Sequence, residues 1–249
     1  MDLSTLPLVG PLIGGALHLG AELLAALTIA LDPVAGPLAA ALAVVLVTLA
    51  VRALLVPLSV LQVRAERDRR RLAPQLAALR RRHRGDAERL RRAVQELYTS
   101  EHVSPLAGCL PVLAQAPVVS VVYALFTHAT IAGATNALLE ATLVGIPLGH
   151  SFVAVVASPL WAHAWVLVLL LAVLAVVVEL TRRSNLRWNP PEPVDAAVPG
   201  AAATSAVTRW VPFVTVVFAA VAPSAAALYV VTSAAWTAGE RALLRRVLR

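Results

Sequence analysis

The sequence predicts an all-α integral membrane protein with five transmembrane helices, a cytoplasmic helical hairpin and an interfacial helix at the N-terminus. The first observation is composition: 59% of the 249 residues are hydrophobic and the mean hydropathy is +0.78, well above the values of soluble domains. The second is that long apolar runs alternate with Arg-rich segments. The third is that every basic residue is Arg, and all but one fall in three clusters, which fit the cytoplasmic ends of membrane helices.

Residues 1–36 are predicted to form an extracytoplasmic, interfacial segment, and residues 37–249 a membrane-embedded core. Leucines recur along one helical stripe between residues 16 and 31, with His18 and Glu22 beside them. This pattern is typical of an amphipathic helix that lies in the membrane interface. The competing interpretation is a sixth span, and the charge of Glu22 argues against it.

The first predicted span covers residues 38–61 and contains a single charge, Arg52. Roughly 20 mostly apolar residues cross a bilayer, so this run is long enough. A charged side chain at membrane depth costs roughly 3 kcal/mol or more, and it usually faces a water-filled cavity with a function. Two structural alternatives are open for Arg52. Its side chain can extend to the lipid headgroups, or it can pair with Glu179 or Glu140.

Residues 62–101 differ sharply from the first span, because they contain twelve Arg and six acidic residues. Leucines recur at helical spacing in both halves of this segment. Between the halves, Gly85 can end one helix and Asp86 can cap the next. The pattern predicts a charged helical hairpin on the cytoplasmic side.

The rest of the chain alternates between apolar spans and polar connections. Residues 128–163 carry no Lys or Arg and are predicted to form a loop with short helices. Residues 181–209 are predicted to form a flexible cytoplasmic loop, and residues 239–249 a basic tail. Prolines are expected to kink or break helices at Pro57, Pro111, Pro117 and Pro223. Further spans are predicted over residues 106–127, 164–180, 210–222 and 224–238.

The topology depends on residues 210–238, which can form one long helix or two helices that separate near Pro223. Two helices return the chain to the side from which it came, so that 20 of the 21 Arg lie in the cytoplasm. The positive-inside rule favours this arrangement. It places the N-terminus outside and the C-terminus in the cytoplasm, and its short last spans imply a locally thinned bilayer.

Several stretches of the sequence carry a family resemblance. In the first span, Arg52 precedes a Leu-Leu-x-Pro-Leu element that ends at Leu58. The hairpin contains LAPQLAALRRRHRGDAERLRRAVQELY, the second span contains VSPLAGCLPVLAQAPVVSVVY, and the last two spans contain VAPSAAALYVVTSAAW. In these elements and in the order of its spans, the chain resembles the YidC/Oxa/Alb family of membrane protein insertases over residues 38–249. It is similar to the short five-span bacterial form.

The resemblance implies an insertase and chaperone of the bacterial cytoplasmic membrane. Nascent membrane proteins would enter a hydrophilic groove that opens to the cytoplasm, and they would leave it laterally into lipid. Arg52 would attract the polar tail of a client, since a guanidinium binds carboxylates. Thr48 lies one turn before Arg52 on the same helix face, and Gln115 matches a groove-facing Gln of the family. Further candidates for the groove are the hydroxyls of Ser120, Thr215, Thr232 and Ser233.

Two interpretations of the hairpin remain open. It can be a solvated element that only satisfies the distribution of positive charge. The resemblance implies instead a mobile platform that receives clients and contacts the ribosome, because Arg-dense surfaces bind RNA phosphates without sequence specificity. Action alone and action beside the Sec translocon as a further partner both remain open from the sequence. The residues expected at client or ribosome contacts are Arg80, Arg81, Arg82, Arg84, Arg245 and Arg246.

A function of a different class is open from the residues alone, namely a small-solute transporter or channel in which Arg52 binds an anion. Such proteins usually carry internal repeats or charged residues deep in several spans. We find no repeat, and the predicted spans contain no acidic residue besides Glu179. An intramembrane enzyme would need a nucleophile with a base, or a metal. The six His are scattered without metal-ligand spacing, so we expect no metal, no cofactor and no enzymatic activity.

Overall fold

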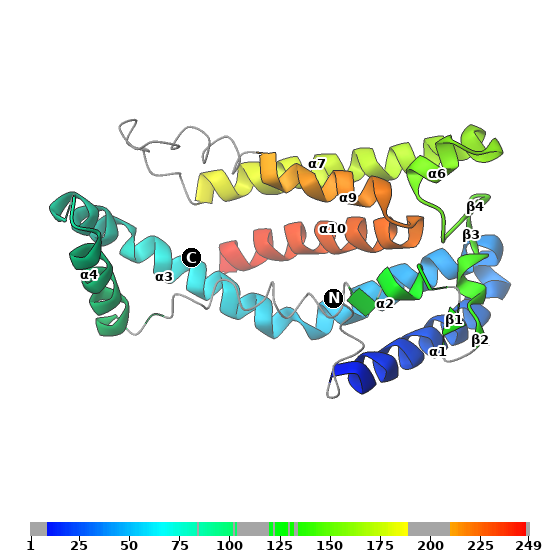
Figure 1. Cartoon of the computed structure of the whole chain (residues 1–249), viewed down its shortest axis with the longest axis horizontal. Coiled ribbons are helices and arrows are strands. Elements are labelled where there is room, and N and C mark those ends of the chain that lie inside the picture. The colour runs from blue at the N-terminus through cyan, green and yellow to red at the C-terminus, as the bar shows by residue number, and fades with distance from the viewer. Residues whose placement is uncertain are drawn as a thin grey trace. The chain divides into compact units, whose positions relative to one another are not determined.

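The computed structural model describes residues 9–83, 85–101, 103, 120–121, 123–128, 130–131, 134–188 and 210–247 (Figure 1). The chain divides into two compact units, each of which is described by itself. The first unit comprises Met1–Ala53 and Pro117–Ala238, and the second comprises Leu54–Ala116 and Gly239–Arg249. The described residues are mostly α-helical, as the sequence predicts, with short 3-10 segments and two small pairs of strands.

In the first unit, helix α1 (Val9–Ala35) and helix α2 (Ala39–Leu54) are joined by a 3-10 turn, η2 (Gly36–Leu38). Gly36 has a φ of +49°, which glycine adopts without strain, and the chain reverses there so that α1 returns along α2 (Figure 1). The expected helix over residues 16–31 is therefore too short. Leu24, Leu27 and Leu31 of the predicted stripe join the hydrophobic core, whereas Leu19 and Leu23 are exposed, and mostly apolar flanking residues extend the helix at both ends.

A hydrophobic core joins α1 and α2 to helix α10 (Ser224–Val247), whose residues up to Ala238 belong to the first unit. Leu24 of α1, Ala40 and Ala43 of α2, and Ala225 and Tyr229 of α10 belong to this one buried cluster. Small side chains let helix backbones approach closely, which is a common way for helices to associate in membranes. Because of this packing, α2 and α10 lie against each other and run in the same direction (Figure 1).

The predicted break near Pro223 is confirmed. Helix α9 (Val214–Val221) follows the 3-10 segment η6 (Val211–Phe213), and Ala222 is extended before α10 begins. The N–H of Ser224 donates to the carbonyl of His150 at 2.8 Å, which fixes the start of α10. α9 and α10 run in opposite directions and pack with helix α7 (Ala164–Trp188) through the buried residues Leu174, Val178, Ala219, Ala227 and Val231 (Figure 1).

The connection before α7 contains short helices, as expected, but also strands that the sequence pattern did not indicate. β1 (Thr130–Ile131) pairs with β2 (Ala134–Thr135), and β3 (Thr142–Leu143) pairs with β4 (Ile146–Pro147), both antiparallel. Val144 and Gly145 connect β3 to β4 with positive φ at both positions, the geometry of a tight hairpin turn. Two-residue strands leave too little alternation to be detected in a sequence. The helical segments here are η4 (Ala137–Leu139), α6 (Phe152–Val156) and η5 (Pro159–His163).

The second unit contains helix α3 (Val56–Arg82) and helix α4 (Ala87–Ser100). The predicted break at Pro57 is confirmed: α2 ends at Leu54, and α3 begins with Pro57 in its first turn, where the missing N–H is tolerated. The first predicted span is thus two helices in the structure. The predicted cap of α4 is also confirmed, since Asp86 Oδ1 accepts the N–H of Arg89 at 2.9 Å.

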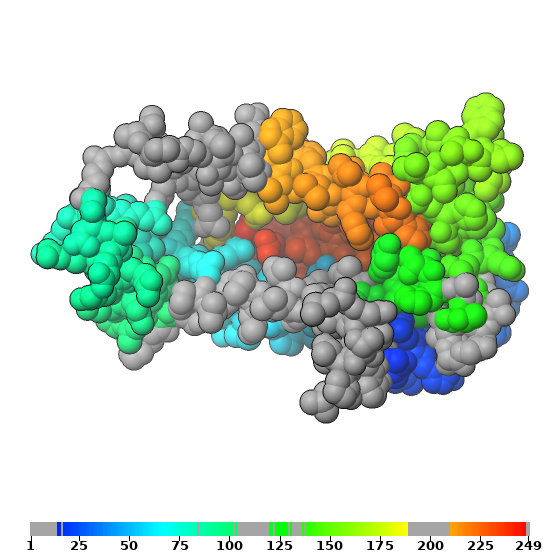
Figure 2. All heavy atoms as spheres, viewed as in Figure 1, coloured from blue at the N-terminus to red at the C-terminus, as the bar shows by residue number. Residues whose placement is uncertain are grey.

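Two helical stretches of the described chain are long and apolar enough to cross a membrane, Leu17–Leu54 and Pro159–Trp188. The apolar helix at Val211–Val221 is shorter. Large apolar side chains are exposed on α7 and α9, and Figure 2 shows the face of α9 in orange. Such a surface is rare on soluble proteins and fits contact with lipid. α7 continues beyond the predicted end near residue 180, and most of the predicted span 106–127 and of the loop 181–209 lies outside the described residues.

Candidate functional site

Arg52 lies in the last turn of α2, at the point where the sequence places the only charge of the first predicted span. Its Nε–H donates to the hydroxyl of Ser233 on α10 at a distance of 3.2 Å. The side chain of Arg52 is half-buried, and Ser233 is only 4% exposed. A cation in the last turn of a helix also interacts favourably with the helix dipole.

The contact between Arg52 and Ser233 follows from the parallel packing of α2 and α10. Val44, Thr48 and Arg52 are spaced by four residues and share one face of α2, while Tyr229 and Ser233 share one face of α10. Val44 and Tyr229 belong to the same buried cluster. Further along both helices, the apolar packing gives way to the hydrogen bond between Arg52 and Ser233.

The other predicted groove residues have different surroundings. Thr48 is buried, and its hydroxyl donates to the carbonyl of Val44 at 2.6 Å. The hydroxyl of Thr232 donates to the carbonyl of Leu228 at 2.8 Å. These two hydroxyls therefore satisfy the backbone of their own helices. Ser120 and Thr215 are exposed, and Gln115 lies outside the described residues.

Glu179, which was one possible partner of Arg52, is paired with two other arginines in the structure. Arg182 donates to both carboxylate oxygens of Glu179, at 2.7 and 2.8 Å, and Arg183 donates to Oε1 at 2.6 Å. All three residues lie in the C-terminal half of α7. The only acidic residue within the predicted spans is thus held by arginines of its own helix.

Two aromatic residues that were not predicted as site residues, Tyr229 and Trp236, share the face of α10 that carries Ser233. Tyr229 is buried, and the indole N–H of Trp236 is buried without a hydrogen-bond partner in the described part of the chain. The spacing of four and three residues around Ser233 is a helical signal that could have found both. Tyr229 lies about one turn before Ser233 on α10, and Trp236 about one turn after it.

A second set of arginines lies where α10 ends, within the second unit. Arg245 donates to Glu66 Oε2 at 2.9 Å, and Arg241 lies 3.6 Å from Glu66 Oε1 and donates to Gln62 at 3.3 Å. The side chain of Arg245 is only 6% exposed. The residues assigned to a basic tail are therefore the end of α10 as far as Val247, and Arg245 is engaged within the chain.

Four of the remaining residues expected at client or ribosome contacts are described by the structure, and all four lie on the surface. Arg80, Arg81 and Arg82 belong to the last turn of α3, and Arg246 is exposed beside Arg245. Arg84 lies outside the described residues. A contact with clients or the ribosome thus remains a prediction for these arginines. The buried ion pair of Arg245 instead indicates a structural role, which its place in a predicted basic tail did not suggest.

These features define a helical membrane protein with a half-buried arginine near the end of its first core helix. The family model described as "60Kd inner membrane protein" matches residues 31–249, which is most of the chain. The chain therefore belongs to this family, the YidC/Oxa/Alb family, and the predicted resemblance is confirmed.

Individual relatives match a shorter stretch. A protein of Clostridium perfringens named membrane protein insertase YidC is 33% identical over 84 residues, which are 34% of this chain and 35% of that protein. A protein of the same name from Pseudomonas putida is 40% identical over 77 residues, 31% of this chain and 14% of that protein. One from Shewanella halifaxensis is 42% identical over 77 residues, again 31% of this chain and 14% of that protein. The chain thus covers about a third or less of the length of these relatives.

Proposed function

We propose that this protein inserts membrane proteins into the bacterial cytoplasmic membrane. Family membership supports this class of function, and the contact between Arg52 and Ser233 carries its local chemistry. That contact joins α2 to α10 and holds a guanidinium, half-buried, among apolar helices. In this proposal Arg52 lies in a hydrophilic groove that opens to the cytoplasm and to lipid.

The proposed function of the groove depends on the guanidinium of Arg52. A client with an acidic outer tail must move that tail across hydrocarbon, where an unpaired charge is strongly unfavourable. Arg52 lowers this barrier because its planar fork binds carboxylates and its charge persists at any physiological pH. The apolar part of the client then moves laterally into lipid, driven by roughly 0.8 kcal/mol for each CH₂ group that leaves water. No nucleotide is required for this step.

The proposed topology has five spans, with the N-terminus outside and the C-terminus in the cytoplasm. The turn at Pro223 supports it, because α9 and α10 run in opposite directions and the chain returns to the side from which α9 began. The arginines of α7 and α10 then lie at cytoplasmic ends. α1 is a peripheral helix in this scheme, and its packing on α2 also suits the alternative of a sixth span.

We assign Arg52 and Ser233 to the centre of the groove and keep Gln115, Ser120 and Thr215 as further contacts. Thr48 and Thr232 support the helices themselves, since their hydroxyls bind their own backbone. The arginines at the end of α3 and at Arg246 are proposed to contact clients or the ribosome during synthesis. Action beside the Sec translocon is part of the same proposal.

Insertion by the purified protein in liposomes tests this function. A single-span client with an acidic outer tail is compared with the same client carrying a neutral tail, and anion flux is measured in parallel. We expect insertion of both clients and no flux. Arg52→Ala should reduce insertion of the acidic client by about 10- to 100-fold, equivalent to about 1.4–2.7 kcal/mol, whereas Arg52→Lys should retain part of the activity. Anion flux without insertion would favour the transporter, and full activity of Arg52→Ala would exclude the proposed role of this residue.

A further inference from the structure

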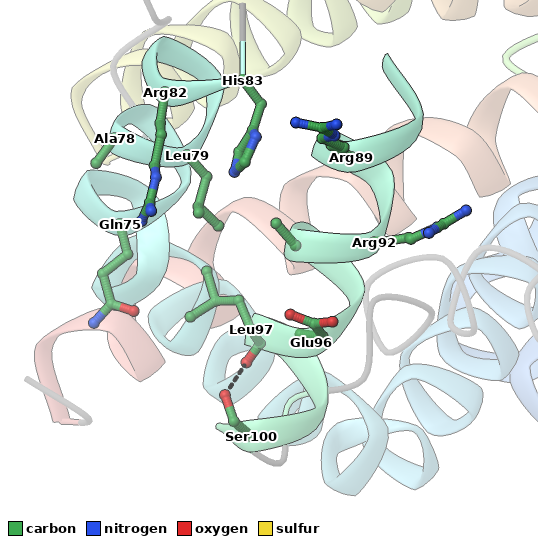
Figure 3. Close-up of a pocket in the computed structure, with 11 residues that line it drawn as sticks. Gln75, Ala78, Leu79, Arg82, His83, Arg89, Arg92, Glu96, Leu97 and Ser100 are labelled. Atoms are coloured by element: carbon green, nitrogen blue, oxygen red, sulfur yellow. Dashed lines mark hydrogen bonds between the residues drawn. The ribbon is translucent and has the colours of Figure 1, made fainter. Parts of the chain in front are cut away.

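The hairpin of the second unit contains an open cavity of about 730 Å³ between α3 and α4 (Figure 3). Leu79, Arg82 and His83 line it from the α3 side, and Arg89, Ala93 and Leu97 line it from the α4 side. In Figure 3, Leu79 and Leu97 point into the space between the helices, and Arg89 lies at one edge near His83. The cavity therefore combines an aliphatic interior with a basic rim.

The cations of the rim are available to an incoming anion. Arg82 is exposed and has no ion-pair partner among the residues that the structure describes. Arg89 pairs with Asp86 at 3.0 Å, but their side chains are 76% and 44% exposed. Exposed pairs contribute only about 0–1 kcal/mol, so a ligand carboxylate can replace Asp86 as partner. Arg92 also lines the cavity and pairs with Glu88 of its own helix.

We propose that this cavity binds an acidic, amphipathic peptide segment. Aliphatic side chains of the peptide would pack on Leu79 and Leu97, and its carboxylates would bind Arg82 and Arg89. The inference rests on the proposed function, because it identifies the peptide as the acidic tail of a client before that tail reaches Arg52. The same chemistry, carboxylates near aliphatic side chains, would then be selected at both places.

The lining residues favour a peptide over RNA or lipid. Single-stranded RNA is usually held by aromatic side chains that stack on its bases, and none of the residues that line the cavity is Phe, Tyr or Trp. The cavity begins at Gln75, about 28 Å along α3 from Val56 at about 1.5 Å per residue, so it is remote from the apolar start of that helix.

Peptide binding to the full-length protein in detergent tests the proposal. The probe is a fluorescent peptide of about 12 residues, roughly three helical turns, with Leu on one face and Glu on the other. A peptide with Lys in place of Glu is the first control. Arg82→Gln/Arg89→Gln removes the rim charges, and Arg64→Gln/Arg91→Gln removes two exposed charges from the same helices outside the cavity. Ala93→Trp fills the cavity without a change of charge, and circular dichroism confirms that each variant is folded.

We expect the rim variant and Ala93→Trp to weaken binding of the acidic peptide by about tenfold or more, and the matched variant by less than about twofold. Equal weakening by both charge pairs would overturn the proposal, because it would indicate attraction without a site. Equal affinity for the Lys peptide would also overturn it. A third contrary result would be that the wild-type protein does not bind the acidic peptide, while the rim variant loses binding to RNA or to anionic vesicles. If wild-type protein inserts clients but does not bind the peptide, only this inference fails. If it does not insert clients, the proposed function fails.

Discussion

Arg52 and Arg245 each make a side-chain contact between distant segments, to a hydroxyl in one case and to a carboxylate in the other. Arg52 donates to the hydroxyl of Ser233, 181 residues later in the chain, and Arg245 donates to the carboxylate of Glu66, 179 residues earlier. Both contacts join distant segments, and neither arginine is fully exposed. A carboxylate balances the charge of a guanidinium, whereas a hydroxyl only orients it. The ion pair with Glu66 supports a structural role for Arg245, and the role proposed above for Arg52 uses its charge.

The two environments also predict different responses to mutation. A buried ion pair adds little net stability, because desolvation of both charges offsets their attraction. Removal of one partner is nevertheless strongly unfavourable, since the other charge stays buried and unpaired. The hydroxyl partner of Arg52 carries no charge, so its loss leaves the electrostatic balance of the site unchanged.

The largest effect is expected for Glu66→Ala. Its loss leaves Arg245 with 6% of its side chain exposed and without this carboxylate. We expect the end of α10 to lose about 3 kcal/mol of local stability, the lower end of the range for a broken buried pair, because Glu66 is itself 21% exposed. Hydrogen exchange of the amides at Arg241–Val247 measures this loss in the purified protein.

Two further variants make this measurement specific. Glu66→Leu/Arg245→Met replaces both charges by apolar side chains and should restore most of the protection. Arg246→Gln removes an exposed neighbouring charge and should change the stability by less than about 0.5 kcal/mol. Unchanged exchange in Glu66→Ala would show that the buried arginine does not hold α10, and the contrast with Arg52 would be lost.

A smaller effect is expected for Ser233→Ala. This variant removes the acceptor of Arg52 Nε–H, a partly buried hydrogen bond to a charged group, so we expect a loss of about 1.5 kcal/mol in the orientation of Arg52. Insertion of acid-tailed clients should fall several-fold, less than in Arg52→Ala, and insertion of neutral-tailed clients should be unaffected. Thr232→Val is the matched control, because this neighbouring hydroxyl serves its own helix. Equal effects of the two variants on both clients would contradict the role of Ser233.

Local chemistry made part of the fold predictable. The breaks at Pro57 and Pro223 and the cap at Asp86 depend on a few adjacent residues, and the structure places all three as expected. The extent of α1 was not predicted, because the leucine pattern covers only its middle and mostly apolar residues continue the helix at both ends. The strand pair at Thr142–Pro147 depends on a two-residue turn with positive φ, for which Val144 gives no signal.

The candidate site was predictable in its charge but not in its contacts. A lone Arg in an apolar run identified Arg52, because a charge at membrane depth is costly and is therefore rare outside functional positions. In the sequence, nothing distinguished Ser233 from the other hydroxyls that were candidates for the groove. What distinguishes it is its position on α10 opposite Arg52, which depends on how α2 and α10 pack in the core. The burial of Arg245 depends likewise on a contact with Glu66 that lies beyond any local pattern.

The smallest effect is expected for Thr48→Val, which tests whether Arg52 acts with a polar neighbour. Thr48 lies one turn before Arg52 on the same face, but it is buried and its hydroxyl donates to Val44 O. Valine has nearly the same shape, and the carbonyl of Val44 is also the normal acceptor for a backbone N–H of the helix. We therefore expect stability within about 1 kcal/mol of the wild type and unchanged insertion of the acid-tailed client. A loss comparable with that of Arg52→Ala would show that the client contacts this hydroxyl, and the groove would then extend along α2 toward Val44.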